Sequence, residues 1–331
     1  MIKINIHFYF RISITHTHRD SHRDSHLNPH RNPHRNPHRT ASPRLYELAL
    51  QKVGEMGDAV SRSTRENYLT ALRSLQRYAG NLCVSDIGTT LLHGYERWLH
   101  GQGISRNTSS CYMRSLRAVL GKVTGSDASA LFKEVYTGRD TTEKRAVSET
   151  TITLLKQAEL PDGSQLALAR DLFLFSFYAQ GMPFVDMAFL KRKQLSDSQM
   201  VYHRHKTGTR ISVSLLPCMQ RIISRYQSQE SYVFPLLHAT DAATAYGEYL
   251  TQLNWYNRTL KLLARRVGVT DRLTSYTSRH TWATAAYHAD VGLPVISKAL
   301  GHQNPQTTLT YLHEIDDRRL DEANRRIAAR V

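Results

Sequence analysis

The sequence of 331 residues predicts a mainly α-helical protein with a small β-sheet, built as a helical domain followed by an α+β domain. The first observation is helical periodicity, because apolar residues recur at spacings of three and four in several stretches after Leu45. The second is a stretch of alternating polar and apolar residues near 199–216, which is typical of a β-hairpin. The third is a polar segment without an apolar face at 137–146, which indicates a boundary between domains.

Length and composition agree with two globular domains and a tail. The chain is 40% hydrophobic and 22% charged, which suffices for a sizeable core. Its three cysteines, Cys83, Cys111 and Cys218, are widely spaced and odd in number, so we expect neither a disulfide framework nor a zinc site. No apolar run has membrane-spanning length and no signal-peptide core is present. We therefore expect a cytoplasmic protein.

The charge indicates a polyanionic partner. The formal net charge is +16, of which residues 1–44 contribute +6, so an excess of +10 remains for the rest of the chain. No basic amphipathic membrane helix or lipidation motif is found, and nucleic acid is therefore the favoured partner over a membrane. A protein with that partner is expected at the bacterial nucleoid.

The N-terminal tail has an unusual repeat. Residues 18–39 repeat every four residues with almost no apolar content, and such a segment cannot offset the entropy of ordering. Residues 1–43 are therefore predicted to be disordered. The histidine-rich repeat can bind metal, but its regularity favours a translated tandem DNA repeat or a start codon placed too far upstream.

Three helices are predicted next, and together they indicate an all-helical domain over 44–130. The first follows a capping pattern at Ser63 or Thr64, and the second, near 91–100, is broken by Gly101. The third begins at Asn107 or Thr108. The apolar stripes of the first and third helices are Tyr68, Leu72, Leu75 and Tyr78, and then Tyr112, Leu116, Val119 and Leu120.

Basic residues cluster on or beside these helices. As a group they predict a groove that tracks a phosphate backbone, whereas any one of them equally fits a solvated helix face. The six arginines are Arg62, Arg65, Arg73, Arg106, Arg114 and Arg117.

A linker is predicted at 131–146, and a second domain at 147–331. Within it the alternating stretch turns at a Lys-Thr-Gly sequence, which predicts the hairpin. Helices are predicted near 148–160, 164–180, 217–228, 241–267, 278–290 and 293–300. A last helix, from about Asp316 to Arg330, would carry a stripe of Leu320, Ala323 and Ile327.

Motifs in the second domain resemble those of the tyrosine recombinases, the phage-integrase family of DNA strand-exchange enzymes. TSRHTWAT resembles the family's arginine box, LGH followed nine residues later by a tyrosine resembles its nucleophile box, and HKTG resembles its hairpin lysine turn. The resemblance covers roughly residues 60 to 315. It implies that the first domain is the SAM-like core-binding domain and the second the catalytic domain.

The resemblance implies roles for four residues. Tyr311 would be the nucleophile that takes the phosphate from DNA, because its phenol, with a free pKa of about 10, needs cations and in-line positioning to attack. Arg279 would bind the non-bridging oxygens as a fork, and His302 would donate a hydrogen bond or assist proton transfer near neutral pH. Lys206 would protonate the leaving oxygen. No carboxylate cluster for two-metal chemistry accompanies them, so neither metal nor cofactor is expected.

The chain departs from the family pattern at two positions. Pro183 occupies the place of the first active-site arginine, as in some integrases of mobile elements, so an active enzyme needs a replacement cation. The candidates nearby in sequence are Lys191, Arg192, Lys193 and Arg210, and the sequence does not choose among them.

Other side chains near that position can support the site. Gln180 can donate a hydrogen bond, and Asp186 either orients Arg279 or is simply buried beside a helix end. Tyr276 replaces a family histidine and is expected to position the phosphate, or else to be an alternative nucleophile.

The expected function is site-specific DNA recombination by a clamp of two DNA-contacting domains. The resemblance implies duplex DNA and other copies of the chain as partners, as a tetramer on synapsed sites, with a C-terminal segment passed to a neighbour. Accessory DNA-bending proteins are a further expected partner. Two alternatives remain: a DNA-binding protein that has lost catalysis, and a topoisomerase or telomere resolvase, against which the short gap between Arg279 and Tyr311 argues.

Overall fold

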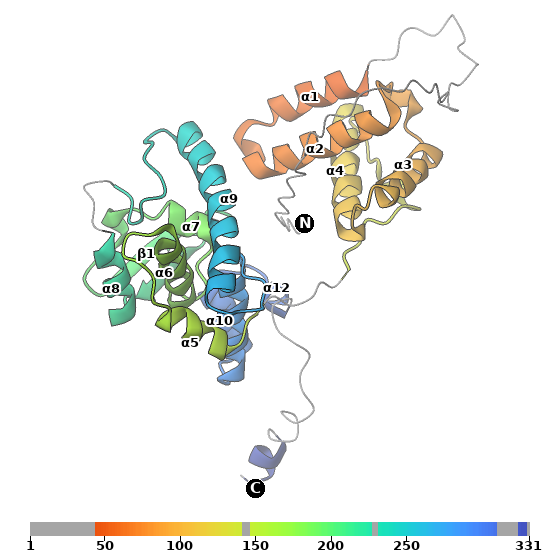
Figure 1. Ribbon diagram of the computed structural model, residues 1–331. Coiled ribbons are helices and arrows are strands. Elements are labelled where there is room, and N and C mark those ends of the chain that lie inside the picture. Colours follow the sequence, from red (N-terminus) through yellow and green to blue (C-terminus); the bar gives the residue numbers. More distant parts are fainter. Residues whose placement is uncertain (1–43, 141–145, 227–230, 310–323, 330–331) are drawn as a thin grey trace, which may run out of the picture. The chain divides into compact units, whose positions relative to one another are not determined.

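The computed structural model describes residues 44–140, 146–226, 231–309 and 324–329 (Figure 1). The chain divides into two compact units, Met1–Thr142 and Glu143–Val331. Both are built mainly from helices, and the second also holds one two-stranded antiparallel sheet, so the predicted fold class is confirmed. The predicted disordered tail, Tyr311, and two residues of the C-terminal stripe, Leu320 and Ala323, lie outside the described residues.

Four helices form most of the first unit, and serine caps decide where two of them begin. The Ser61 hydroxyl accepts from the Thr64 amide at 3.2 Å, and that of Ser105 accepts from the Thr108 amide at 3.4 Å. The predicted cap at Ser63 or Thr64 is therefore wrong, because both residues are inside α2. The predicted start of α4 at Asn107 or Thr108 is one or two residues late. The helices are α1 Leu45–Glu55, α2 Arg62–Ala79, α3 Thr89–Gly101 and α4 Arg106–Thr124.

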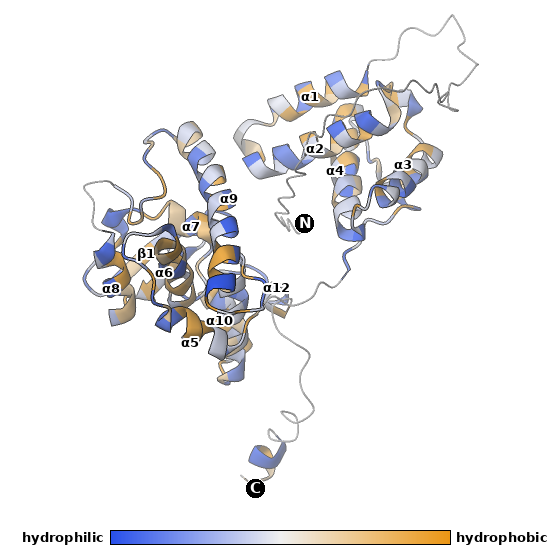
Figure 2. Ribbon diagram, viewed as in Figure 1, coloured by the Kyte–Doolittle hydropathy of each residue, from blue (hydrophilic) through white to orange (hydrophobic). Residues whose placement is uncertain are grey.

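The predicted apolar stripes form the core of this unit. Leu72 and Leu75 of α2 are each 2% exposed, and they pack with Leu116 of α4 in one cluster. Tyr95 of α3 is fully buried, with its ring centroid 5.6 Å from that of Tyr78. Figure 2 shows the matching hydropathy, with apolar and polar residues alternating around each helix. Periodicity therefore identified the part of this core that α2 and α4 contribute.

The predicted linker at 131–146 is wrong over its described first part, because residues 131–140 pack on the first unit. Phe132 and Val135 are buried in its core. Asn107 and Asp140 exchange two hydrogen bonds, of 3.1 Å from the Asn107 amide and 2.9 Å from the Asp140 backbone. Arg114 donates to the carbonyls of Thr137 at 2.9 Å and Gly138 at 2.7 Å. The backbone of this polar segment, which has no helical periodicity, is therefore held by hydrogen bonds to side chains of α4.

The second unit follows the predicted order of helices with two additions, α7 and α12, too short for periodicity to reveal. Within the described residues, no helix has both the length and the apolar character to cross a membrane. The elements are α5 Glu149–Gln157, α6 Gln165–Tyr178, α7 Phe184–Ala188, β1 Gln199–His203, β2 Arg210–Ser214, α8 Pro217–Arg225, α9 Ala242–Arg266, α10 Thr277–His288, α11 Leu293–Ala299 and α12 Gln306–Leu309.

Helix α6 is the centre of the second unit. It contacts α5, α8, α9 and α10, and its Phe173 and Phe175 are fully buried. A helix enclosed on several sides must be apolar around most of its circumference, as the sequence of α6 is. Its one buried acid, Asp171, is satisfied by Arg225 at 3.0 Å and by the Tyr226 hydroxyl at 2.9 Å. Asp171 thereby joins the middle of α6 to the C-terminal end of α8.

The predicted hairpin is confirmed, and its register fixes which side chains point inward. Met200 pairs with Val213 and Tyr202 with Ile211, and these four side chains form the buried face. Side chains alternate along a strand, so the next residue on the same face after Tyr202 is Arg204. Arg204 begins the six-residue turn between the strands, and its amide donates to the Thr209 carbonyl at 2.9 Å.

The contacts of Arg114 lead to a test of its role. We expect Arg114→Gln to lower the free energy of unfolding of the first unit by about 1.5–3 kcal/mol, because bonds from a charged donor to two carbonyls are lost. Hydrogen exchange should accelerate in peptides covering 133–140. Arg73→Gln, at an exposed position of α2, should change stability by less than about 0.5 kcal/mol. Unchanged exchange at 133–140 in Arg114→Gln would contradict the structural role.

Candidate active site

The LGH sequence forms the C-terminal turn of α11, and this turn organises the site. Gly301 has φ +64° and its amide donates to the Lys298 carbonyl, while the His302 amide donates to the Ser297 carbonyl, each at 3.0 Å. This pair of bonds is the Schellman arrangement, which requires a left-handed residue at the glycine position. It leaves the carbonyl of Leu300, at the helix end, to accept from side chains of other elements.

Arg279 is the first of these side chains. It lies in the first turn of α10 and is only 1% exposed. Its Nη2 donates to the Leu300 carbonyl at 2.6 Å and its Nη1 to the Gly181 carbonyl at 2.8 Å. Gly181 has φ +71°, and a Cβ there would lie 2.9 Å from the Arg279 Cα, so only glycine permits this approach. The guanidinium is therefore held in a fixed orientation by two helix-terminal turns.

The turn that carries Gly181 is itself anchored. The Ser176 hydroxyl donates to the Met182 carbonyl at 2.6 Å and shares a hydrogen bond of 2.7 Å with the Ser278 hydroxyl. Ser278 is the neighbour of Arg279 in α10, and both serines are buried. These bonds tie the end of α6 to the start of α10.

His302 is in direct contact with Arg279. Its Nε2 lies 3.1 Å from Arg279 Nη2 and its Nδ1 lies 2.9 Å from the Thr308 hydroxyl oxygen. A guanidinium can only donate, so Nε2 must be the acceptor, and Nδ1 carries the proton that Thr308 receives. Burial, with the nearby charges of Arg279, Arg204 and Lys206, lowers the pKa of His302 to about 3. The expectation that it titrates near neutrality is therefore corrected for the free protein, in which the imidazole is neutral.

Arg204 is a member of the site that the sequence argument missed. It is 6% exposed, and its Nη1 donates to the same Leu300 carbonyl that Arg279 uses. Its side chain passes over Gly301, where a Cβ would lie 3.1 Å from the Arg204 Cγ. The signal that could have found it is the strand alternation, since Met200, Tyr202 and Arg204 share one face.

Asp186 pairs with Arg204, which corrects the expectation that it orients Arg279. In the described part of the chain its ion pair is with Arg204 Nε, at 3.0 Å, and its other oxygen accepts from the His205 amide at 2.7 Å. Burial raises the pKa of the Asp186 carboxyl, while the Arg204 charge and the His205 amide oppose that rise. The same burial lowers the pKa of the Arg204 guanidinium. The alternative of burial beside a helix end is correct as well, since Asp186 is 4% exposed in the first turn of α7, and this burial is accompanied by the pair with Arg204.

The remaining predicted residues surround this cluster. Lys206 is exposed on the hairpin turn, and its charge contributes to the lowered pKa of His302. Tyr276 is the N-cap residue of α10 and 38% exposed, with its ring 5.4 Å from that of His280. Gln180 has φ +59° beside Gly181, and Pro183 is the buried N-cap residue of α7.

The four cations that the sequence offered as replacements for the missing arginine make other contacts or face solvent. Arg192 donates to the Tyr226 carbonyl at 2.7 Å, and the Lys191 ammonium lies 5.7 Å from the centre of the Tyr232 ring. Lys193 and Arg210 are exposed. None of these contacts involves Leu300, Asp186 or His302.

The six arginines of the first unit differ in what they contact. Arg62, Arg65 and Arg73 lie on α2 at spacings that place them near one stripe of that helix. Arg106 lies over the ring of Tyr136 at 3.8 Å and pairs with Asp140 at 3.4 Å, and Arg114 binds the loop carbonyls described above. Arg117 is half-buried on α4. Two of the six therefore hold the first unit together in this structure.

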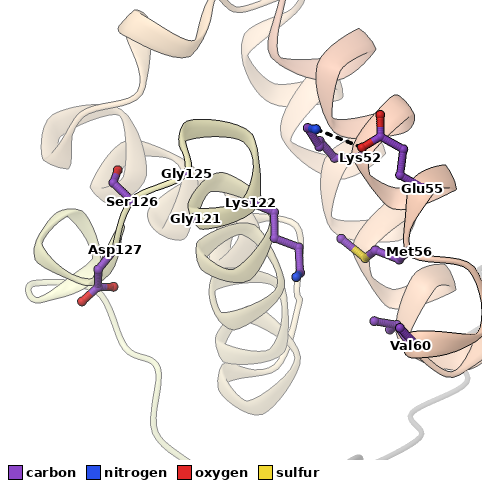
Figure 3. A pocket seen from close by; sticks show the side chains of 10 residues that line it. Lys52, Glu55, Met56, Val60, Gly121, Lys122, Gly125, Ser126 and Asp127 are labelled. Atoms are coloured by element: carbon purple, nitrogen blue, oxygen red, sulfur yellow. Dashed lines mark hydrogen bonds and ion pairs between the residues drawn. The ribbon is translucent and has the colours of Figure 1, made fainter.

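A pocket in the first unit is separate from these groups. Its volume is about 500 Å³, and it lies between the ends of α1 and α4, where Lys52 pairs with Glu55 at 2.9 Å (Figure 3). None of the predicted catalytic residues lines it. Among the described residues, no cluster of His, Cys, Asp and Glu is arranged to hold a metal ion.

The glycine of the LGH turn can be tested by substitution. We expect Gly301→Ala to lower the free energy of unfolding by roughly 2–4 kcal/mol, from the left-handed φ and from overlap with Arg204 and Ile211. Gly268→Ala is the matched control, because Gly268 has φ +70° but nothing within 4 Å of the added Cβ. Its cost should be about 1–2 kcal/mol in urea unfolding. Equal costs for the two variants would contradict the close packing on Arg204.

The lowered pKa of His302 predicts a pH dependence of stability. The unfolded chain, with a histidine pKa near 6.5, binds a proton on acidification that the folded chain does not bind until about pH 3. Stability is therefore present above pH 6.5 and falls as the pH drops, by up to about 2 kcal/mol between pH 7 and 5. Urea unfolding of wild type and His302→Gln at pH 7 and pH 5 measures this loss, which should be smaller in His302→Gln by the contribution of the imidazole. An NMR titration midpoint between 6 and 7 for His302 in the folded protein would refute the prediction.

Comparison with known proteins agrees with the arrangement of these motifs. Residues 154–318 match the family described as the Phage integrase family, and residues 44–123 match the Phage integrase SAM-like domain. The Tyrosine recombinase XerD of Shewanella oneidensis is 24% identical over 275 residues, covering 77% of this chain and 87% of that protein. XerD of Pseudomonas putida is 24% identical over 267 residues, with the same coverage.

Solved structures show the same fold. A lambda integrase tetramer bound to a Holliday junction matches with a TM-score of 0.64 at 12% identity, over 83% of this chain and 79% of that one. The Tn1549 transposon integrase in complex with transposon right end DNA matches with a TM-score of 0.60 at 14% identity, over 86% of this chain and all of that one. Since both family matches occur in the expected order and cover most of the residues after 43, this chain belongs to the phage integrase family of tyrosine recombinases.

Proposed function

We propose that this protein is a site-specific DNA recombinase that cuts and rejoins strands through a 3′-phosphotyrosine intermediate. The observation that carries the proposal is the contact between two motifs far apart in the sequence. Arg279 of TSRH and His302 of LGH meet at 3.1 Å, and the Leu300 carbonyl binds the same guanidinium. A guanidinium and an imidazole held together at two helix ends form a site suited to a phosphate anion.

The proposed reaction conserves the energy of the phosphodiester. The phenol oxygen of Tyr311 attacks the scissile phosphorus, a bond from phosphorus to tyrosine forms, and the bond from phosphorus to the 5′-oxygen breaks. The phenol proton passes to a base and the leaving 5′-oxygen receives a proton from an acid. A 5′-hydroxyl from the partner strand then reverses the steps and releases Tyr311. No metal ion or cofactor takes part in this scheme.

His302 is proposed as the base in this scheme. In the free protein it is neutral, and its hydrogen bond to Thr308 leaves the Nε2 lone pair toward Arg279. An imidazole in that state accepts a proton and does not donate one from Nε2. Tyr311 is three residues beyond Thr308 in the chain, so only a short connection separates the proposed nucleophile from the residue that positions the proposed base.

Lys206, Tyr276 and Arg279 complete the proposed site. The exposed Lys206 is proposed to protonate the leaving oxygen, and Arg279 to bind both non-bridging oxygens of the phosphate. Tyr276, at the N-cap of α10, is proposed to hydrogen-bond the phosphate. Gln180 and Asp186 support the two arginines through the turn after α6 and through α7.

Duplex DNA and further copies of the chain are the proposed partners. Structural neighbours of this fold are a dimer of lambda integrase bound to a core site and a tetramer bound to a Holliday junction. We propose the same partners here, with the arginines of α2 on the DNA backbone and accessory DNA-bending proteins at some sites. A segment from the C-terminal part of the chain is proposed to pass to a neighbouring protomer.

One observation favours a second function, a DNA-binding protein that has lost catalysis. Pro183 occupies the position of the first active-site arginine, and losing one such donor costs about 2.7–4 kcal/mol of transition-state stabilisation. A trapping experiment decides between the two functions. We expect the protein, in EDTA, to form an SDS-stable adduct with members of a randomised library of nicked duplexes, from which the site is read by sequencing.

Variants assign the nucleophile in the same assay. Tyr311→Phe should lose the adduct completely and retain its DNA affinity within about twofold, because the phenol oxygen carries the reaction and little of the binding. Tyr276→Phe should retain the adduct. An adduct that persists in Tyr311→Phe and vanishes in Tyr276→Phe would transfer the role to Tyr276. DNA binding by wild type without any adduct would establish the binding function instead.

A further inference from the structure

We propose that Arg204 supplies the second guanidinium of the active site, contacting the scissile phosphate in place of the arginine that is missing at Pro183. The inference rests on the proposed function, because it assigns a ligand-binding role within the same site. It also answers which cation replaces the missing one, since Arg204 was not among the four that the sequence offered.

The position of Arg204 is defined by a shared acceptor. Arg204 Nη1 and Arg279 Nη2 both donate to the carbonyl oxygen of Leu300, so the two guanidinium groups lie side by side at the end of α11. Arg279 Nη2 also contacts His302 Nε2 at 3.1 Å. An anion that binds at Arg279 and His302 would therefore also lie close to Arg204.

The relation to Pro183 follows from α7. Asp186 and Pro183 are three residues apart at the start of this helix, so they lie on one side of its first turn. Asp186 holds Arg204 Nε at 3.0 Å. The guanidinium of Arg204, which comes from the hairpin, is thus placed one helical turn from position 183. The Arg204 guanidinium therefore reaches the region of position 183 from the hairpin, whereas the family's first arginine would reach it from position 183 itself.

Positive charge is concentrated around Leu300, which suits an anionic ligand. Two nearly buried guanidinium groups, those of Arg204 and Arg279, meet at one carbonyl. Lys206 is close enough for its charge to lower the pKa of His302. Like charges repel each other strongly where water is scarce, and an anion bound between them offsets that repulsion. A phosphodiester is such an anion.

Arg204 has donors for such a ligand. The structure describes a bond from Nη1 to Leu300 and a contact from Nε to Asp186, which leaves the two N–H groups of Nη2 without a described acceptor. A purely structural arginine would need only the first two contacts to tie the hairpin to α11. The proposal therefore predicts a charge-specific role on DNA in addition to any effect on folding.

A change in the substrate separates the contact of Arg204 with the phosphate from its effect on folding. A methylphosphonate at the scissile position of the trapped duplex replaces one charged oxygen by a methyl group, so the transition state needs one cation less. We expect Arg204→Ala to form the adduct at least about 100-fold more slowly than wild type on the phosphate, and within about tenfold of wild type on the methylphosphonate. Arg204→Lys, which keeps a charge without the fork, should fall between wild type and Arg204→Ala on the phosphate.

Arg192→Ala is the matched control, because Arg192 is another arginine of this unit that binds a backbone carbonyl, that of Tyr226. It should slow both substrates by the same factor. If Arg204→Ala also slows both substrates by the same factor, Arg204 is structural and the proposal is wrong. If Arg204→Ala does not fold, the same comparison is made with Arg204→Lys, whose defect should be smaller on the methylphosphonate.

A thermal-shift measurement with inorganic phosphate tests the anion contact of Arg204 independently of the proposed reaction. At matched ionic strength, phosphate should raise the thermal midpoint of wild type and Arg192→Ala, and raise that of the Arg204 variants by less than half as much. Wild type that forms no adduct on any library member refutes the proposed function, and the phosphate shift then decides the role of Arg204. An equal shift in wild type and in the Arg204 variants refutes the anion contact.

Discussion

The carbonyl of Leu300 is the point on which the site depends. It belongs to the C-cap residue of α11, and the left-handed turn at Gly301 leaves it without a partner in its own helix. Two arginines from different elements bind it, one from α10 and one from the hairpin turn. One backbone group thereby fixes the separation of the two guanidinium groups and, through the following residue, the place of His302. The LGH motif therefore sets the geometry of the site and also supplies its histidine.

The approach of two arginines to one carbonyl has an electrostatic cost. Two cations in a partly dry environment repel each other by on the order of a few kcal/mol, which one carboxylate at Asp186 offsets only in part. The same cations add to the effect of burial at His302, and together they keep its imidazole neutral. A phosphate would relieve the repulsion and at the same time favour protonation of the imidazole, so anion binding and proton uptake are coupled here. Without a ligand, the two adjacent guanidinium groups lower the stability of the fold. With a ligand, they suit an enzyme that must stabilise a developing negative charge.

The arginines of the first unit differ in what they contact. Arg106 and Arg114 are used to hold residues 136–140 on the helices, through a ring, a carboxylate and two carbonyls. Arg62, Arg65 and Arg73 of α2 form a stripe instead. Side chains of one type, at similar spacings in sequence, therefore have different contacts in the folded unit. The number of arginines predicts a polyanionic partner but does not say which arginines would contact it.

Much of the fold could be predicted from the sequence, because it depends on local patterns. Helical periodicity identified Leu72, Leu75 and Leu116 as core, and alternation identified the hairpin through Met200 and Tyr202. The spacing of TSRH and LGH predicted the family, and Arg279 and His302 do lie together. Periodicity could not show that residues 131–140 pack on the first unit, since those bonds come from side chains distant in sequence.

Local patterns in the sequence predicted the hairpin, most of the helices, the family and most residue types of the cluster, but not α7 or α12. Only the tertiary structure decided that Arg204 belongs to the site, that Asp186 holds Arg204, and that His302 is neutral. Each of these is a property of groups brought together from different elements: a shared carbonyl, a buried ion pair, and a pKa lowered by burial and then by three neighbouring charges. No single segment contains that information, because the hairpin, α7, α10 and α11 meet only in the folded chain.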